Sequence, residues 1–168
     1  MTISSQTSCE HEGTEERLNV SDSLEHSYQL QLFENGSGWS AKVFDVDTLA
    51  GQIHCLNQGD ALFLGDLHVL RAATRPIQGL ARLRGWLGLP TRGRIENYRN
   101  RGLGSALLNL VINRARAHGF RRVIGRLAPI DLKEDPKLPD WYRRRGFQIA
   151  VASNRLTGDL ELVLSGPD

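Results

Sequence analysis

Alternating apolar and polar positions predict a series of short strands in the first half of the chain. The alternation runs from Tyr28 to Phe33 and again from Trp39 to Asp45, with an Asn-Gly turn signal between them at residues 34–38. Further strands are predicted at Leu49–Leu56 and at Ala61–Leu70, and the latter is the most apolar of the four. Because only short turns separate these strands, they predict an antiparallel meander.

The pattern changes to a helical period in the second half. An apolar stripe of helical spacing runs from Leu103 to Ala115, and Gly119 follows as a stop signal. Turn and breaker residues divide the rest of the chain into shorter elements. In order, these are a strand at Val123–Leu127, a loop at Ala128–Pro136, a short helix at Leu138–Arg145, and two strands at Phe147–Ala152 and Leu160–Leu164 joined by a turn at Thr157-Gly158-Asp159.

These elements predict an α/β (α+β) fold, in which helices flank a mixed, mostly antiparallel central sheet of about six or seven strands. Residues 1–27 are rich in Ser, Thr and Glu, show no period, and predict a disordered acidic tail. Residues 28–168 are then expected to form a single domain, since no repeat or second core is visible. Within it, residues 71–96 predict an amphipathic segment that its glycines weaken as a helix. The apolar residues of this segment at helical spacing are Leu80, Leu83, Trp86 and Leu87.

Charge is distributed unevenly although the net charge is only +2. Residues 1–27 hold six acids and one arginine, whereas residues 71–101 hold eight arginines and one acid. The chain uses 18 arginines against three lysines, and the planar guanidinium suits bidentate phosphate contacts. The arginine-rich stretch therefore indicates a phosphate-bearing partner, with a merely solvated basic face as the alternative.

Composition limits the class of protein. A chain of 168 residues can bury one core, and no apolar run approaches the roughly 18–20 residues that cross a bilayer. The polar start, Met1 to Glu16, does not resemble a secretory signal. Cys9 and Cys55 are too few for a disulfide framework, and Cys9 with His11 is a poor metal site. We therefore expect a cytoplasmic protein without a metal.

The strongest chemical signal is a glycine pair at the start of the predicted long helix. Amides in the first helical turn lack internal partners, and the helix dipole adds about half a positive charge there. A diphosphate can bind these amides if no Cβ blocks it, a clearance that Gly102 and Gly104 supply, while Arg99 and Arg101 add charge. The stretch reads Arg99-Asn100-Arg101-Gly102-Leu103-Gly104-Ser105-Ala106.

Other glycine motifs do not match this stretch. It lacks the Gly-Lys-Ser/Thr of a P-loop NTPase, and Leu107 stands where a dinucleotide fingerprint requires its third glycine. A helix start with permissive glycines that binds nothing is the remaining structural alternative.

Two motifs together resemble the GNAT acetyltransferase superfamily over about residues 60–152. Arg99-x-x-Gly102-x-Gly104 is similar to that superfamily's coenzyme A loop. The segment from Trp141-Tyr142 to Gly146-Phe147 is similar to its aromatic-Tyr-x-x-x-Gly-Phe motif, in the same order and at the same spacing. The strand at Asp66–Val69 resembles the strand that precedes the loop.

The resemblance implies acetyl-CoA as cosubstrate and direct transfer of the acetyl group to a primary amine of an unidentified acceptor. It implies that the strand backbone near Leu67 and Val69 meets the acyl arm, and that Tyr142 protonates the departing thiolate. Asp66 and His68 share one face of the strand and are candidates for removing the proton of the amine. The residues expected to bind the cofactor are Leu67, Val69, Arg99, Asn100, Arg101, Gly102, Leu103, Gly104 and Ser105.

Three departures from the superfamily's pattern accompany the resemblance. Residues 71–96 intervene between strand and loop, only a turn at residues 34–38 replaces two usual helices, and Asp135 replaces a frequent Asn.

Two other functions stay open: an RNA- or ribosome-binding module that uses the arginines, and an acyl-CoA-binding sensor without catalysis. An exposed apolar strand edge is a candidate homodimer contact.

Overall fold

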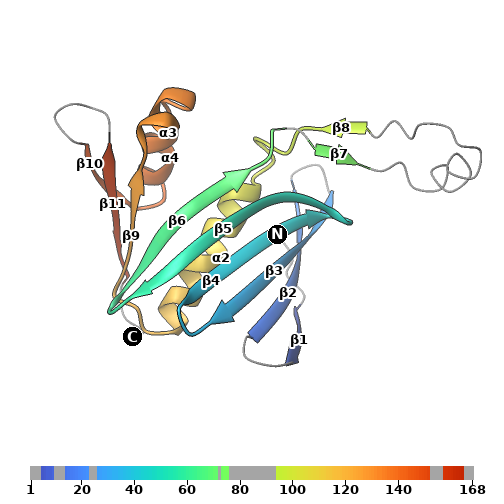
Figure 1. Cartoon of the computed structure of the whole chain (residues 1–168), viewed down its shortest axis with the longest axis horizontal. Coiled ribbons are helices and arrows are strands. Elements are labelled where there is room, and N and C mark those ends of the chain that lie inside the picture. The colour runs from blue at the N-terminus through green and yellow to red at the C-terminus, as the bar shows by residue number, and fades with distance from the viewer. Residues whose placement is uncertain are drawn as a thin grey trace, which may run out of the picture.

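The computed structural model describes residues 5–9, 14–22, 26–71, 73–75, 94–151 and 157–164. Within these residues nine strands form one sheet, in the order β1-β2-β3-β4-β5-β6-β9-β11-β10, and two short strands pair separately (Figure 1). The strands are β1 (Ser5–Cys9), β2 (Thr14–Ser21), β3 (Ser27–Asn35), β4 (Gly38–Asp45), β5 (Thr48–Gln58), β6 (Ala61–Val69), β7 (Ala73–Arg75), β8 (Arg94–Glu96), β9 (Arg122–Leu127), β10 (Gln148–Val151) and β11 (Gly158–Val163). The helices are α2 (Leu103–Ala117), α3 (Pro129–Glu134) and α4 (Leu138–Arg143).

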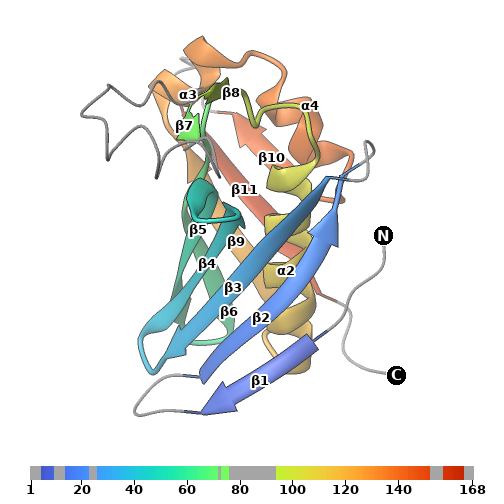
Figure 2. The ribbon, with the colours of Figure 1, turned by 90° about the vertical axis from the view of Figure 1, so that its right-hand side faces the viewer.

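The first six strands are antiparallel neighbours, so the predicted meander is confirmed. One face of this half of the sheet is apolar and packs against α2 (Figures 1 and 2). Alternate residues such as Leu30, Leu32, Ala41 and Val43 are buried there because successive side chains point to opposite faces. No helix covers the opposite face among the described residues, as the short β3–β4 turn leads one to expect.

The direction of the sheet changes between β6 and β9, which are parallel. Helix α2 makes the crossover between them, and its apolar stripe, including Leu107 and Val111, is fully buried. Strand β11 then pairs antiparallel with β9, and β10 pairs antiparallel with β11 at the edge of the sheet. The predicted mixed, mostly antiparallel sheet flanked by helices is therefore confirmed.

The prediction of a disordered tail over residues 1–27 is wrong where the structure describes them. Strand β2 pairs with β3 along its whole length, and its Leu18 and Val20 are buried in the core. Glu16 of β2 also forms an ion pair with Arg114 of α2, at 3.4 Å. The short alternation around Leu18 was obscured by the acidic composition, and β1 and β2 raise the number of strands above the predicted six or seven.

Two smaller predictions also need correction. The expected loop at Ala128–Pro136 contains helix α3, which begins with Pro129 in its first turn and has Asp131 as its capping acid. A turn was expected at Thr157-Gly158-Asp159. Gly158 and Asp159 instead belong to β11 and pair with residues of β9 and β10. Both errors arose because Pro and Gly also occupy the first positions of regular elements.

The arginine-rich insertion leaves and rejoins the fold at one place. Strands β7 and β8 pair with each other beyond the end of β6 (Figure 1), and the Tyr98 amide donates to the Leu70 carbonyl at 3.3 Å. The chain thus resumes beside the residue where β6 ended. The segment expected to be amphipathic, with Leu80, Leu83, Trp86 and Leu87, lies outside the described residues.

In the described part of the chain, no helix is long and apolar enough to cross a membrane.

Prediction: replacing Leu18 by Ala lowers the free energy of unfolding by about 2–3 kcal/mol, because the substitution leaves a cavity under β2. Asn19→Ala on the exposed face of the same strand is the matched control and changes stability by less than about 0.5 kcal/mol. Urea denaturation measures both variants. Equal, negligible effects would show that β2 is not packed on the sheet.

Candidate functional site

Strands β6 and β9 pair over a few residues and then separate (Figure 1). Their parallel pairing runs from Ala61 opposite Arg122 to Leu64 opposite Gly125, and it goes no further. Beyond Leu64, the edge of β6 that faces β9 has no strand partner among the described residues. This separation opens the sheet on the side where α2 and α4 lie.

A β-bulge at Gly65 changes which side chains of β6 face the helices. Leu64 lies opposite Cys55 and Asp66 lies opposite His54, so Gly65 is an extra residue on β6. After the bulge, Asp66 and His68 are exposed on the outer face. Leu67 and Val69 turn to the helical face, where Val69 packs 3.5 Å from the position that a Cβ on Gly104 would occupy.

A cavity of about 390 Å³ fills the space between the separated strands and the two helices. All of the predicted site residues line it except Arg101 and His68. The full lining is Leu64, Gly65, Asp66, Leu67, Val69, Tyr98, Arg99, Asn100, Gly102, Leu103, Gly104, Ser105, Arg126, Leu127, Asp131, Asp135, Leu138, Trp141, Tyr142 and Leu160.

The N-terminus of α2 opens into this cavity without a cap. Gly102 is the N-cap residue at a φ of 83°, a left-handed conformation that glycine adopts without strain, and it has no side-chain cap. The first helical hydrogen bond is donated by Ala106 to Gly102. In the described part of the chain, no acceptor bonds the amides of Leu103, Gly104 and Ser105. These amides, with the dipole of a 15-residue helix behind them, form a seat for an anion.

Arg145 lies beside this seat, and sequence reasoning missed it. Its guanidinium stacks on Trp141, 3.9 Å from the ring centroid, and donates to the Trp141 carbonyl at 2.7 Å. It also donates to the hydroxyl of Ser105, in the first turn of α2. The four-residue spacing from Trp141 was a usable signal in the predicted helix Leu138–Arg145, although α4 itself ends at Arg143.

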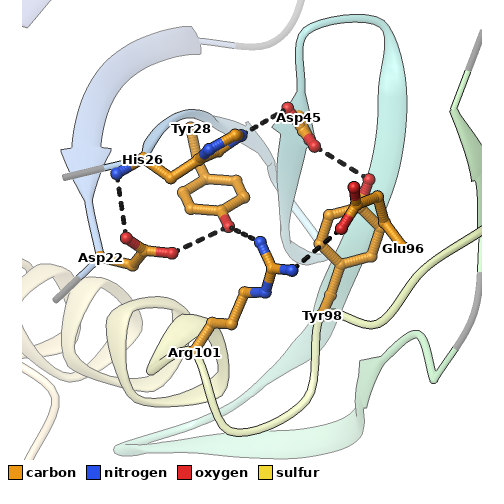
Figure 3. A network of polar contacts seen from close by, with 7 residues as sticks. All are labelled: Asp22, His26, Tyr28, Asp45, Glu96, Tyr98 and Arg101. Atoms are coloured by element: carbon orange, nitrogen blue, oxygen red, sulfur yellow. Dashed lines mark hydrogen bonds and ion pairs between the residues drawn. The ribbon is translucent and has the colours of Figure 1, made fainter. Parts of the chain in front are cut away.

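Arg101 does not line the cavity, and its side chain points toward Tyr28 and Glu96 (Figure 3). Its guanidinium donates to the Tyr28 hydroxyl at 3.1 Å and to Glu96 at 3.0 Å. The prediction that Arg101 contacts the anion is therefore not supported by its position. Its contacts fasten the loop before α2 to β3 and β8.

A second set of contacts connects the same loop to β4 (Figure 3). Asp45, at the end of β4, is only 1% exposed and accepts a hydrogen bond from Tyr98 at 3.0 Å. The ring of His26 lies 3.3 Å from the other oxygen of Asp45. Burial of a carboxylate is costly unless it is hydrogen-bonded, so these partners are required for stability. The network positions Tyr98 directly before the arginine and glycine residues of the loop.

Tyr142 is buried and lines the cavity, and its ring packs edge-on against Trp141 and Phe147. Burial raises the pKa of its phenol above the ordinary 10.0, and the negative charges of Asp131 and Asp66 raise it further. Its hydroxyl has no hydrogen-bond partner among the described residues. The phenol therefore keeps its proton at neutral pH and is available as a donor.

The candidate proton acceptors differ in position. Asp66 lines the cavity, while His68 is exposed on the outer face and does not. Asp131 lines the cavity and accepts a hydrogen bond from the Ala128 amide at 2.8 Å, so it also holds the start of α3. Asp135 lines the cavity as well. No group of three or more potential ligands that could hold a metal ion occurs among the described residues.

Comparisons with known proteins agree on one class. The acetyltransferase (GNAT) family model matches residues 92–147, which contain the glycine loop, α2 and the Trp141-Tyr142 motif. No curated protein matches the chain.

Solved structures give the same result for the fold. A GNAT-family acetyltransferase from Desulfovibrio desulfuricans has a TM-score of 0.51 at 20% identity, over 77% of this chain and 71% of that one. The ribosomal-protein-S18-alanine N-acetyltransferase from Escherichia coli has a TM-score of 0.54 at 13% identity, over 80% and 74%. The PaiA N-acetyltransferase from Thermoplasma acidophilum, in complex with coenzyme A, has a TM-score of 0.52 at 12% identity, over 76% and 62%.

The chain therefore has the fold of the GNAT acetyltransferases, and its residues 92–147 carry the sequence pattern of that family. The resemblance inferred from the two motifs is confirmed.

Prediction: Tyr98→Phe lowers the free energy of unfolding by about 1–3 kcal/mol, because it removes a donor from the buried Asp45. A double-mutant cycle with Asp45→Asn, followed by urea denaturation, is expected to give a coupling energy between about 0.5 and 3 kcal/mol. Additive effects of the two substitutions would contradict the contact.

Proposed function

We propose that this chain transfers an acetyl group from acetyl-CoA to a primary amine. One observation carries the proposal: the amides at the start of α2 and the edge of β6, both without a partner among the described residues, line a single cavity together with Tyr142. This arrangement offers an anion seat, a strand edge and a proton donor within one cavity. A thioester carried on a long, amide-containing arm with a diphosphate requires these three features.

The diphosphate of acetyl-CoA binds at the amides of Leu103, Gly104 and Ser105, where Arg99 adds positive charge. A Cβ on Gly104 would only reach ordinary contact distance from Val69 and Trp141, so the backbone at this position is accessible from the cavity. The amides of the pantetheine arm hydrogen-bond the free edge of β6 at Leu67 and Val69, as an added strand would.

The reaction is a direct transfer in a complex of all three components. The amine nitrogen attacks the thioester carbonyl, a carbon–nitrogen bond forms, and the carbon–sulfur bond breaks. Charge on the carbonyl oxygen is stabilised by a backbone N–H of β6 near Leu67. The phenol of Tyr142 gives its proton to the departing thiolate, and Asp66, directly or through water, accepts the proton lost by the amine. His68 lies on the outer face beside Asp66, on the side left open for an acceptor.

The described arginines support this function over binding of RNA. Arg71 forms an ion pair with Glu134, and Arg101 forms one with Glu96, whereas Arg99 lines the cavity. A non-catalytic acyl-CoA sensor would share the binding features and differ only in turnover. The cytoplasmic location stays a prediction of the sequence.

Prediction: acetyl-CoA at about 100 times its dissociation constant raises the free energy of unfolding by about 2.7 kcal/mol. Gly104→Glu abolishes this stabilisation because its carboxylate occupies the anion seat, while the free protein stays folded, since an acid in the first helical turn interacts favourably with the dipole. Thermal denaturation with and without acetyl-CoA measures both quantities.

Gly36→Glu adds the same side chain at an exposed turn with open space around it and serves as the control. It should respond to acetyl-CoA like the wild type. If Gly104→Glu still responds in full, the diphosphate does not bind at α2.

Prediction: Tyr142→Phe lowers kcat by about 10²- to 10⁴-fold and leaves binding of acetyl-CoA unchanged, because only proton transfer is lost. Release of free thiol from acetyl-CoA, measured over a panel of amines, gives the rates. Since the pKa of Tyr142 is raised, its deprotonation should cause no loss of wild-type activity below about pH 10.

Undiminished turnover in Tyr142→Phe would remove Tyr142 from the mechanism. A wild-type protein that binds acetyl-CoA but releases no thiol with any amine would be a sensor.

A further inference from the structure

We propose that Arg145 binds the diphosphate of coenzyme A together with the amides of α2. This inference rests on the proposed function and assigns a further binding residue to the same site. It concerns a cation that follows α4 in the chain and bonds Ser105 in the first turn of α2, next to residues that line the cavity.

Three contacts fix the position of the Arg145 side chain. The guanidinium plane stacks over Trp141, one nitrogen donates to the Trp141 carbonyl, and another donates to the Ser105 hydroxyl. Trp141 and Ser105 both line the cavity, and Ser105 contributes one of the free amides of the anion seat. The charged group is therefore held beside the place where the diphosphate binds.

The charge of Arg145 has no counterion in the described part of the chain. Its neighbour Arg143 forms an ion pair with Asp140 at 2.7 Å, and Arg114 forms ion pairs with Glu16 and Glu34. Both side-chain hydrogen bonds of Arg145 to described residues go to neutral oxygens, although a guanidinium has five N–H donors. Donors thus remain for a ligand.

The surroundings of Arg145 are unfavourable for a cation when the cavity is empty. The guanidinium contacts the first turn of α2, where the helix dipole is positive, and Arg144 lies next to it in the chain. Burial lowers the pKa of Arg145, and the charge of Arg144 lowers it further. An anion bound between Arg145 and α2 offsets the repulsion between the guanidinium and the positive end of the helix. It brings a negative charge next to the guanidinium and accepts hydrogen bonds from the free amides.

The test compares Arg145→Gln with Arg144→Gln by isothermal titration calorimetry, with coenzyme A and with dephospho-coenzyme A as probes. Arg144 is exposed and adjacent, so its substitution makes the same charge change without removing the contacts that Arg145 makes with Trp141 and Ser105. Arg145→Gln is expected to raise the dissociation constants of both probes about tenfold to a hundredfold, the range of a charge-assisted hydrogen bond. Arg144→Gln is expected to change them less than threefold.

The use of both probes separates the possible outcomes. A loss of affinity confined to coenzyme A would place Arg145 at the 3′-phosphate and overturn the assignment to the diphosphate. Equal affinities of Arg145→Gln and Arg144→Gln would overturn the role of Arg145 altogether. Failure of the wild type to bind either probe would instead refute the proposed function.

Arg145→Lys provides a second variant that keeps the charge. Lysine lacks the planar fork that stacks on Trp141 and bonds two groups at once, so intermediate affinity is expected. Thermal denaturation of each variant without ligand controls for folding. If Arg145→Gln does not fold, wild-type affinity in a folded Arg145→Lys would count against the proposal.

Discussion

Strands β6 and β9 are hydrogen-bonded from Ala61 to Leu64 and then separate, and the rest of the site depends on this separation. A sheet whose strands stayed paired would leave no room between β6 and α4, and no free strand edge for an extended ligand. The extra residue at Gly65 acts at the same point. It turns Leu67 and Val69 toward the helices and leaves Asp66 exposed while still lining the cavity.

The loop that enters α2 is held by residues that are distant in sequence. Tyr98 rests on Asp45 of β4, and Arg101 is bound to Tyr28 of β3 and to Glu96. These contacts lie next to the hydrogen bond between Tyr98 and Leu70, which closes the base of the insertion. The loop therefore keeps its place relative to β6 even though the insertion separates the two in sequence. Strand β2 adds to this support, because it is hydrogen-bonded to β3 in the same sheet.

Much of the fold and the centre of the site could be predicted from the sequence. The stripe from Leu103 to Ala115 and the alternation in β3 to β6 are strong local signals, and a glycine pair at a helix start has a direct physical meaning. Strand β2 was missed because only Leu18 and Val20 show its alternation. The bulge at Gly65 depends on the register against β5, which a single strand does not contain. Arg101 contacts Tyr28, which is 73 residues away in the sequence, whereas Arg145 contacts Ser105 at the start of α2. Neither contact can be read from the sequence around the arginine.

The central claim is that the first amides of α2 bind a diphosphate. Two-dimensional ¹H–¹⁵N NMR spectra recorded during titration with coenzyme A observe these amides one by one. The account predicts that the largest chemical-shift changes occur at Leu103, Gly104 and Ser105, with smaller changes along Leu67 to Val69. Changes confined to another part of the chain, or no changes at saturating ligand, would contradict it.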